Sequence, residues 1–234
     1  MADAKINNES RQFVSFTFYK VDSEWKRLSE KEKQANGEEW TQTIKQVSDG
    51  VLLRSYSTLG MKADCDFMLW KIASNLESLN QLAIAIQKTA LGKHLQTPYS
   101  YLAMTKRSTY VDQHQHEGQE GTRLTVVPGK AKYLFVYPFV KTKAWYQLSQ
   151  EERQKAMNEH IETGHRYPSV KLHTTYSFGL DDQEFVVAFE SDKPEDFLDL
   201  VMDLRSSKAT GYTLKDTPVF TCIRQEISDI LKSF

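Results

Sequence analysis

The sequence predicts an α+β fold of two tandem ferredoxin-like domains, of the dimeric α/β-barrel type, with antiparallel sheets face to face and helices outside. The first supporting observation is an internal repeat. FVSFTFYKVDSEWKRLSEKEKQ, which starts at Phe13, matches YLFVYPFVKTKAWYQLSQEERQ, which starts at Tyr133. The match resumes with LRSYSTLGMKAD from Leu53 and LHTTYSFGLDDQ from Leu172. The second observation is that each copy predicts the same element order, β-α-β-β-α-β.

The first long helix of each copy follows a β-rich run and begins at a capping box. The motif Ser-x-x-Glu joins Ser29 to Glu32 in the first copy and Ser149 to Glu152 in the second, ahead of residues rich in Glu, Lys and Gln. In this motif the two side chains accept hydrogen bonds from backbone N–H groups that the first helical turn leaves without partners. We expect the helix of the second copy to run from about residue 150 to residue 164.

The remaining elements follow from β-branched and aromatic runs, a Gly turn and an amphipathic stretch in each copy. Two strands joined by the turn come first, then a helix with one apolar face, and a last strand closes the unit. The predicted strands and helix are 51–58, 67–72 and 75–90 in the first copy, and 170–178, 184–190 and 193–206 in the second.

Composition shifts suggest where the two domains begin and end. We expect a first domain over residues 10–108 and a second over residues 130–232. The connector between them, residues 109–129, contains YVDQHQHEGQEG and is polar and rich in Gln, His and Gly. This composition predicts a long loop, which in a compact protein is either functional or mobile.

Overall composition is that of an ordinary globular protein, with 40% hydrophobic and 26% charged residues in 234 positions. The formal net charge is −1, so the chain lacks the excess of positive charge that is typical of proteins that bind nucleic acid electrostatically. The longest apolar runs are strand-sized and the N-terminus lacks a signal-peptide pattern, so we expect no membrane partner and a cytoplasmic location. The only cysteines, Cys65 and Cys222, suit a reducing compartment and exclude a Cys-rich metal cluster.

His160 is the first candidate functional residue. It shares one face of the predicted 150–164 helix with Ala156, Met157 and Ile161, so it lies within an apolar stripe. It could hold a buried ion or cofactor there, or it could be a hydrogen-bonded core histidine. The matching position in the first copy is Trp40. Because a residue type that only one copy carries is a candidate for function, the repeat favours the first reading.

Tyr137 lies in the strand KYLFVYPFVK, where alternation puts Tyr133, Phe135 and Tyr137 on one face. Pro138 removes a ladder donor and indicates an edge or irregular strand end, where a phenol could reach a cavity or simply pack. Two cations, Arg123 and Lys141, bracket this strand. They could bind ligand carboxylates, Arg as a bidentate fork and Lys as a point charge, or be solvated surface charges.

Other motifs point to chemistry more weakly. His114 and His116, in QHQHEG, have the spacing of a weak metal site, or of adventitious metal binding. GLDD, at residues 179–182, predicts the turn between two strands. The sequence contains no Gly-rich phosphate loop, no GxSxG elbow and no HExxH motif.

Together these residues resemble a known pattern. YLFVYPFVKTKAWYQLSQEERQKAMNEHIETGHRYPSVKLHTTYSFGLDDQEFVVAFE is similar to the C-terminal domain of the chlorite dismutase superfamily, haem proteins with two ferredoxin-like halves. The motifs that carry the resemblance are YPF-x-K, WY-x-L-x-x-x-x-R, the helix His and GLDD-x-E. The resemblance implies that His160 is the proximal ligand of a haem iron, in iron coproporphyrin III or haem b. It also implies that the first domain is a scaffold with a partner-facing surface.

The resemblance is closest to the coproheme decarboxylase branch. Chlorite dismutases have an Arg in the strand after the proximal His, and Leu172 stands at that position here, so efficient chlorite chemistry is not expected. The decarboxylases also lack that Arg. The resemblance implies that Tyr137 forms the radical, that Lys141 and Arg123 contact propionates, and that Leu172 and Thr217 contact the porphyrin.

Two departures from the family pattern concern the surroundings of the iron. The family commonly has an acid that accepts from the proximal imidazole N–H, and Lys208 stands where we expect it. His160 is therefore expected to have a different partner. On the other side of the porphyrin, His116 or Glu120 is the candidate distal residue.

The sequence thus predicts a haem oxidoreductase that uses hydrogen peroxide to decarboxylate the propionates of iron coproporphyrin III, giving haem b. The alternative is a haem-binding carrier, sensor or weak peroxidase without chlorite dismutase activity. Because members of the family assemble as rings, the resemblance also implies a homopentamer.

Overall fold

The computed structural model describes residues 11–108, 110 and 124–234. Both halves of the chain follow the predicted order of strands and helices, with short helices added in both and one short strand, β8 (Thr213–Lys215), added in the second. The first half comprises β1 (Phe13–Val21), α1 (Ser23–Lys26), α2 (Glu30–Val47), β2 (Val51–Ser57), β3 (Phe67–Ala73), α3 (Leu76–Lys88), η1 (Leu91–His94) and β4 (Leu95–Met104). The second comprises β5 (Tyr133–Lys141), α4 (Lys143–Gln147), α5 (Gln150–His165), β6 (Lys171–Tyr176), β7 (Phe185–Ser191), α6 (Pro194–Leu204), η2 (Lys208–Tyr212), β8 (Thr213–Lys215), β9 (Phe220–Arg224) and α7 (Ile227–Leu231).

Both predicted capping boxes are confirmed. The Ser29 side chain accepts from the backbone N–H of Glu32, whose carboxylate accepts from the Ser29 N–H at 3.0 Å. Ser149 and Glu152 make the same reciprocal pair, with the Ser149 N–H 2.8 Å from the carboxylate. Helices α2 and α5 therefore begin where the sequence predicts, because their first free N–H groups are satisfied locally.

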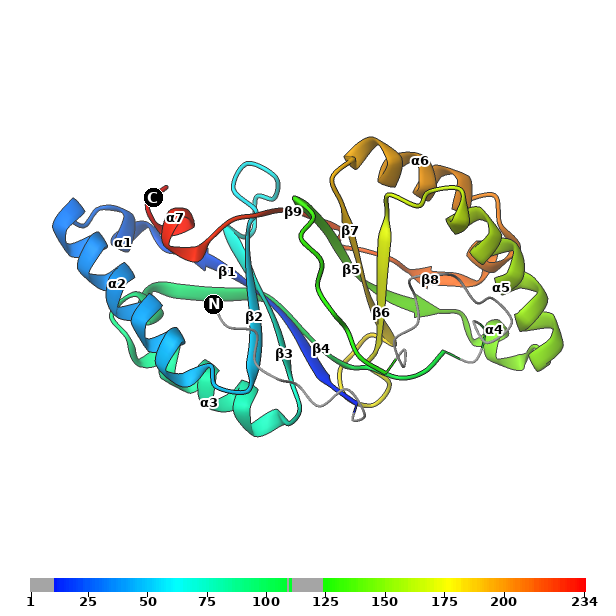
Figure 1. The fold of residues 1–234 in the computed structure, drawn as a ribbon, viewed down its shortest axis with the longest axis horizontal. Coiled ribbons are helices and arrows are strands. Elements are labelled where there is room, and N and C mark those ends of the chain that lie inside the picture. Colours follow the sequence, from blue (N-terminus) through cyan, green and yellow to red (C-terminus); the bar gives the residue numbers. More distant parts are fainter. Residues whose placement is uncertain (1–10, 109, 111–123) are drawn as a thin grey trace.

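The strands form one closed sheet. In the first half they pair in the order β4-β1-β3-β2 and in the second in the order β6-β7-β5-β9. Hydrogen bonds then join β2 to β9 and β4 to β6, so the two sheets expected to lie face to face are halves of one eight-stranded ring. Figure 1 shows the strands in the middle of the molecule, with α2 and α3 at one end and α5 and α6 at the other. The domain boundaries themselves stay a prediction.

Three apolar layers follow from the alternation of side chains across this ring. The interior of the barrel is filled by large side chains from both halves, among them Phe16, Trp70, Leu134, Val136 and Phe220. The outer face of the first half packs against α2, α3 and α7, and the outer face of the second half packs against α6. The sides on which β5 residues lie are as predicted, because Phe135 packs outside while Leu134 and Val136 pack inside.

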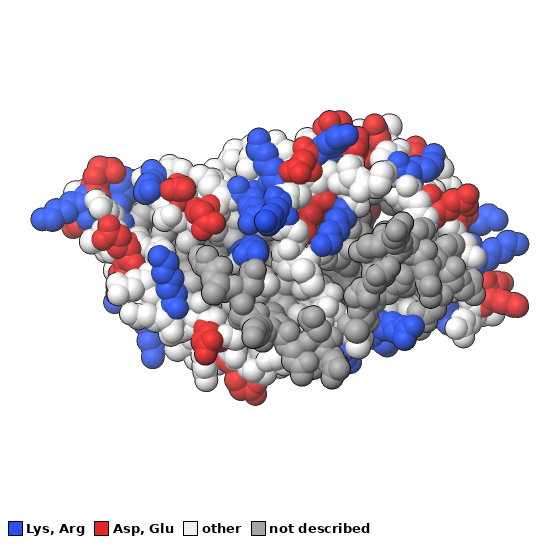
Figure 2. Space-filling model, viewed as in Figure 1, with Lys and Arg blue, Asp and Glu red and all other residues white. Residues whose placement is uncertain are grey.

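The surface carries both signs of charge. On the face shown in Figure 2, Lys and Arg side chains lie among Asp and Glu side chains, with one small group of cations near the middle of the view. None of the helices in the described part of the chain has the length and apolarity that crossing a bilayer requires.

A buried hydrogen-bonded pair of side chains lies inside the barrel. His173 Nε2 is 2.7 Å from Glu190 Oε2, and the two side chains are only 6% and 2% exposed. The Gly129 N–H also donates to Glu190 Oε2, at 2.7 Å. Burial by itself raises the pKa of Glu190, but the bonds from His173 and Gly129 outweigh it and hold this pKa below its ordinary value. The carboxylate is therefore charged at neutral pH.

Replacing His173 by Ala is expected to lower the free energy of unfolding by about 3–5 kcal/mol at pH 7, because Glu190 would keep a buried charge without its main partner. The contribution is fully present above the ordinary glutamate pKa of about 4.3 and is lost as the pH falls below it. Urea unfolding at pH 7 measures the effect, with Thr174→Ala, an exposed neighbour on β6, as the control. Equal stability of the two variants would contradict this account.

Candidate functional site

Helix α5 presents the predicted face to the rest of the second half. Ala156 is buried and Met157, His160 and Ile161 are half-buried, whereas Glu159 between them is exposed. Ala156 and Met157 pack with Trp145 of the preceding short helix, α4. The capping box and this stripe together fix the rotation of α5, so the half-buried position of His160 follows directly from the local sequence.

The imidazole of His160 is neutral and oriented. Burial, and then the positive charge of Lys141, lower the pKa of His160 to about 4. His160 Nδ1 lies 3.4 Å from Ser207 Oγ, and this hydroxyl donates to the Leu204 carbonyl at 2.9 Å. A hydroxyl that donates elsewhere can accept from Nδ1–H, which leaves the lone pair on Nε2. This is the state in which a histidine binds a metal.

The partner of His160 is thus a neutral serine. Lys208, which stands where the family's acid is expected, is exposed, and its backbone N–H points to Glu159 Oε2 at 3.5 Å. The sequence pattern placed the partner at position 208, one residue after Ser207. The bond forms because η2 packs against α5, a contact that the spacing of residues along the chain does not reveal.

Lys141 lies at the end of β5, close enough to His160 for its charge to lower the pKa of the imidazole. Its side chain is buried, and Nζ donates to the Ala209 carbonyl at 2.7 Å and sits 4.5 Å from the centre of the Trp145 ring. Burial lowers the pKa of Lys141 to about 8, although the nearby Glu184 carboxylate opposes the change. Of the three donors of the ammonium group, only one is used by Ala209, so two can meet another acceptor.

Tyr137 lies earlier on β5, half-buried on the outer face of the sheet. Its ring stacks with that of Phe189, with centroids 5.9 Å apart and planes 19° apart. Burial raises the pKa of the phenol well above its usual value; the charge of Asp216 adds to this, and Arg205 opposes it. Tyr137 therefore keeps its proton at neutral pH, and packing with Phe189 holds its ring.

Leu172 marks a difference between the outer faces of the two halves. It pairs across the ladder with Phe189 on β7, yet its side chain is 50% exposed, whereas the matching Leu53 is 7% exposed. In the first half α7 packs on β2 and places Ile227 and Leu231 in the same core as Leu53. The exposure of Leu172 means that β6 has no comparable cover at this position among the described residues, so the outer face of the second half presents an exposed apolar side chain here.

The two halves also differ at the position of His160. Trp40, the matching residue, is fully buried and packs edge-on against Phe67 at 5.9 Å. An imidazole is much smaller than an indole and carries a donor atom. The first half thus fills this position with apolar packing, while the second half offers a nitrogen ligand.

The remaining predicted residues fall into two groups. Thr217 is exposed on the connection between β8 and β9, next to Asp216, whose charge reaches Tyr137. Arg123, His114, His116 and Glu120 lie outside the described residues. The structure therefore brings His160 and Lys141 together and puts Tyr137 and the uncovered Leu172 on the outer side of the same half-barrel.

Several known proteins are similar to this chain in sequence and in fold. A coproheme decarboxylase from Mycolicibacterium smegmatis is 34% identical over 191 residues, which make up 80% of each protein. One from Staphylococcus carnosus is 32% identical over 166 residues, 67% of this chain and 66% of that protein. A chlorite dismutase from Candidatus Nitrospira defluvii, solved in complex with imidazole, superimposes with a TM-score of 0.86 at 27% identity, covering 95% of this chain and 94% of that one. Since the family model described as chlorite dismutase also matches residues 33–225, this chain belongs to the chlorite dismutase family.

Proposed function

We propose that this protein binds iron coproporphyrin III and, with hydrogen peroxide, removes carbon dioxide from two of its propionates to give haem b. The observation that carries the proposal is the neutral, oriented His160 in the half whose outer apolar face is left open. Two relatives named coproheme decarboxylase, at 34% and 32% identity, support the choice of substrate. Porphyrin would then be both substrate and cofactor.

The residues present fit an iron porphyrin. A flat, largely apolar macrocycle needs apolar contacts, and Leu172 offers an apolar side chain that the described part of the chain leaves exposed. Iron accepts neutral imidazole nitrogen, which His160 supplies at Nε2. Propionates need cationic donors, and Lys141 has two that Ala209 does not use. Arg123 and Thr217 are proposed as further contacts to the porphyrin.

Each residue then has a distinct task. When bound, the iron porphyrin supplies the oxidising power with peroxide. Ser207 holds the tautomer of His160, so that the lone pair of Nε2 would be free to bind the iron. Lys141 and Arg123 orient the propionates, which keeps the reacting carbon within reach. Tyr137 would give up an electron and its phenolic proton, and would then take a hydrogen atom from the propionate side chain. A second electron from the substrate would pass to the peroxide-derived oxidant as carbon dioxide leaves and a vinyl group forms, so each hydrogen peroxide is reduced by two electrons to water.

Leu172 argues against chlorite as the substrate. An apolar side chain supplies neither the positive charge nor the hydrogen-bond donors that would hold an oxyanion near the iron. A protein that binds haem without catalysis, as a carrier, sensor or weak peroxidase, is the second candidate, because the same open apolar face would serve it. The cytoplasmic location is proposed on the amino-acid composition, and the pentameric ring on the family resemblance alone.

The deciding experiment loads the purified chain with iron coproporphyrin III, titrates in hydrogen peroxide and follows the porphyrin by mass spectrometry. Stepwise loss of two carboxyl groups, giving haem b, is the expected result. Stable binding with bleaching only would favour the carrier, and the absence of a Soret band shift on loading would contradict porphyrin binding altogether.

The affinity for coproporphyrin is expected to fall as the pH rises from 7 to 9. Because the pKa of Lys141 is about 8, its charge is present at pH 7 and mostly lost at pH 9, which would weaken the contact with a propionate. A loss of roughly threefold to tenfold in affinity is expected from one such charge. Lys141→Met should bind more weakly at pH 7 and lose this part of the pH dependence; identical pH profiles for the two proteins would count against the contact.

A further inference from the structure

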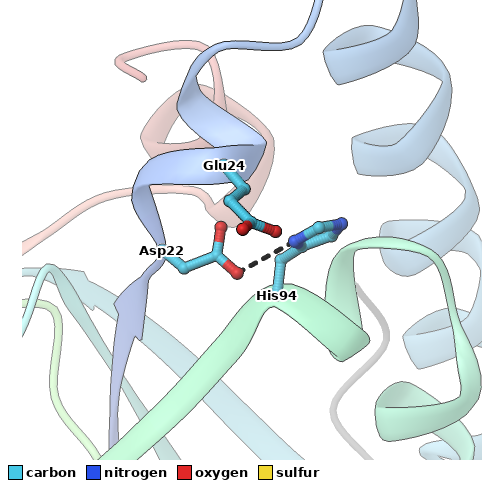
Figure 3. Close-up of side chains that lie close together, drawn as sticks. All are labelled: Asp22, Glu24 and His94. Carbon is cyan, nitrogen blue, oxygen red and sulfur yellow. Dashed lines mark hydrogen bonds and ion pairs between the residues drawn. The ribbon is translucent and has the colours of Figure 1, made fainter.

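A second group of metal-binding side chains lies in the first half, at the other end of the molecule from α5. Asp22 precedes α1, Glu24 is in its first turn and His94 ends η1. Figure 3 shows the two carboxylates and the imidazole directed at the same space. One ligand atom from each residue can be chosen so that all three lie within 4.8 Å of one another.

The backbone holds this group together. The Asp22 N–H donates to the His94 carbonyl at 3.0 Å, where the end of β1 pairs with the start of β4. Asp22 Oδ1 accepts from the Trp25 N–H at 2.7 Å, which fixes the carboxylate, and Oδ2 lies 2.9 Å from His94 Nδ1. Glu24 is exposed and contributes a second carboxylate from the same helix. The ligand atoms are thus carried by an ordered framework.

Comparison of the two halves shows that the fold does not require Asp22, Glu24 and His94. The second half has a backbone hydrogen bond that corresponds to the one between Asp22 and His94: the Thr142 N–H donates to the Tyr212 carbonyl at 2.8 Å. There the corresponding positions hold Thr142, Ala144 and Tyr212, and α4 begins without any hydrogen bond from a capping side chain. The framework therefore forms without carboxylates or imidazole. All three ligand-type residues appear together only in the first half.

We propose that Asp22, Glu24 and His94 bind a divalent transition-metal ion of the Zn²⁺ type. One imidazole nitrogen and two carboxylate oxygens suit Zn²⁺, and three protein ligands leave a fourth position for water. The ion would take the place of the hydrogen bond between His94 Nδ1 and Asp22 Oδ2, since a nitrogen that binds a metal carries no hydrogen. It would tie the β1–α1 junction to the η1–β4 junction, in the half that carries no porphyrin ligand, so the inference does not depend on the proposed function.

The test is a titration of the full-length, chelator-treated protein with ZnCl₂, followed by calorimetry and by a competing chromophoric chelator. We expect one tight site per chain in a background that carries His114→Ala, His116→Ala and His160→Ala, because these changes remove the other candidate nitrogen ligands. In that background Glu24→Gln should weaken zinc binding by about tenfold to a hundredfold. Circular dichroism checks that each variant is folded.

A matched pair of variants separates metal binding from helix capping. Asp22→Asn keeps a side-chain oxygen to cap α1 but removes the charge, so it should lose zinc affinity without losing thermal stability in chelator. Wild-type protein should gain thermal stability on addition of ZnCl₂, and Asp22→Asn and Glu24→Gln should gain less at the same zinc concentration. An unchanged affinity for zinc in Glu24→Gln and His94→Asn, or no binding to the background protein, would overturn the proposal.

Discussion

Replacing His160 by Ala is expected to abolish normal porphyrin ligation, with a loss of about a hundredfold or more in affinity for iron coproporphyrin III. The side chain is the only nitrogen ligand that the described part of the second half presents in a neutral, half-buried and oriented state. Without it the iron would keep at most water on that side, so the Soret band should shift and decarboxylation should stop. Absorption spectra of the loaded variant, with and without added imidazole, measure the effect.

The matched control for this prediction is His165→Ala, which removes an exposed histidine from the end of the same helix. It should bind porphyrin with the spectrum of the wild type. Added imidazole should restore the wild-type spectrum in His160→Ala, because the space for the ring remains. Unchanged iron spectra in His160→Ala would remove His160 from its proposed role.

Replacing Tyr137 by Phe is expected to leave porphyrin binding within about twofold of the wild type and to lower the rate of decarboxylation by about a thousandfold. The ring stacks with Phe189, and this packing survives in Phe, so only the hydroxyl is lost. The raised pKa of Tyr137 means that the wild-type group carries its proton at neutral pH and can supply both an electron and a proton. Single-turnover mass spectrometry after addition of peroxide measures the rate.

Tyr133→Phe is the control, because Tyr133 lies on the same face of β5 and packs in the same cluster. It should decarboxylate at the wild-type rate. Binding lost together with activity in Tyr137→Phe would mean that the phenol holds the porphyrin in place. A wild-type rate in that variant would contradict the proposed hydrogen transfer.

Much of the fold could be predicted from local sequence. The capping boxes at Ser29 and Ser149 set the starts of α2 and α5, since they use only residues three positions apart. Alternation in β5 put Phe135 on one face and Leu134 on the other, because the side-chain period of a strand is two. The structure shows that the face of Phe135 is the outer one. The placement of His160 on the half-buried face of α5 followed from helical spacing in the same way.

Closure of the barrel could not be predicted with the same certainty. It depends on a few pairs between distant strands, such as Met104 with Tyr176 and Tyr56 with Arg224. These pairs form at the edges of two sheets, and an edge strand shows no pattern that names its neighbour. The sequence therefore predicted two sheets facing each other, and the structure joins them into one ring.

The sequence by itself determined the repeat, the element order, the helix starts and the identity of His160, Tyr137 and Lys141 as candidates. Only the tertiary structure decided that Ser207 is the partner of His160, and that Leu172 is exposed while Leu53 is covered. Both facts depend on how elements pack: η2 lies against α5, and α7 covers β2 while β6 stays open. Such contacts join residues far apart in the chain, so local periodicity and capping, which act over a few residues, carry no information about them.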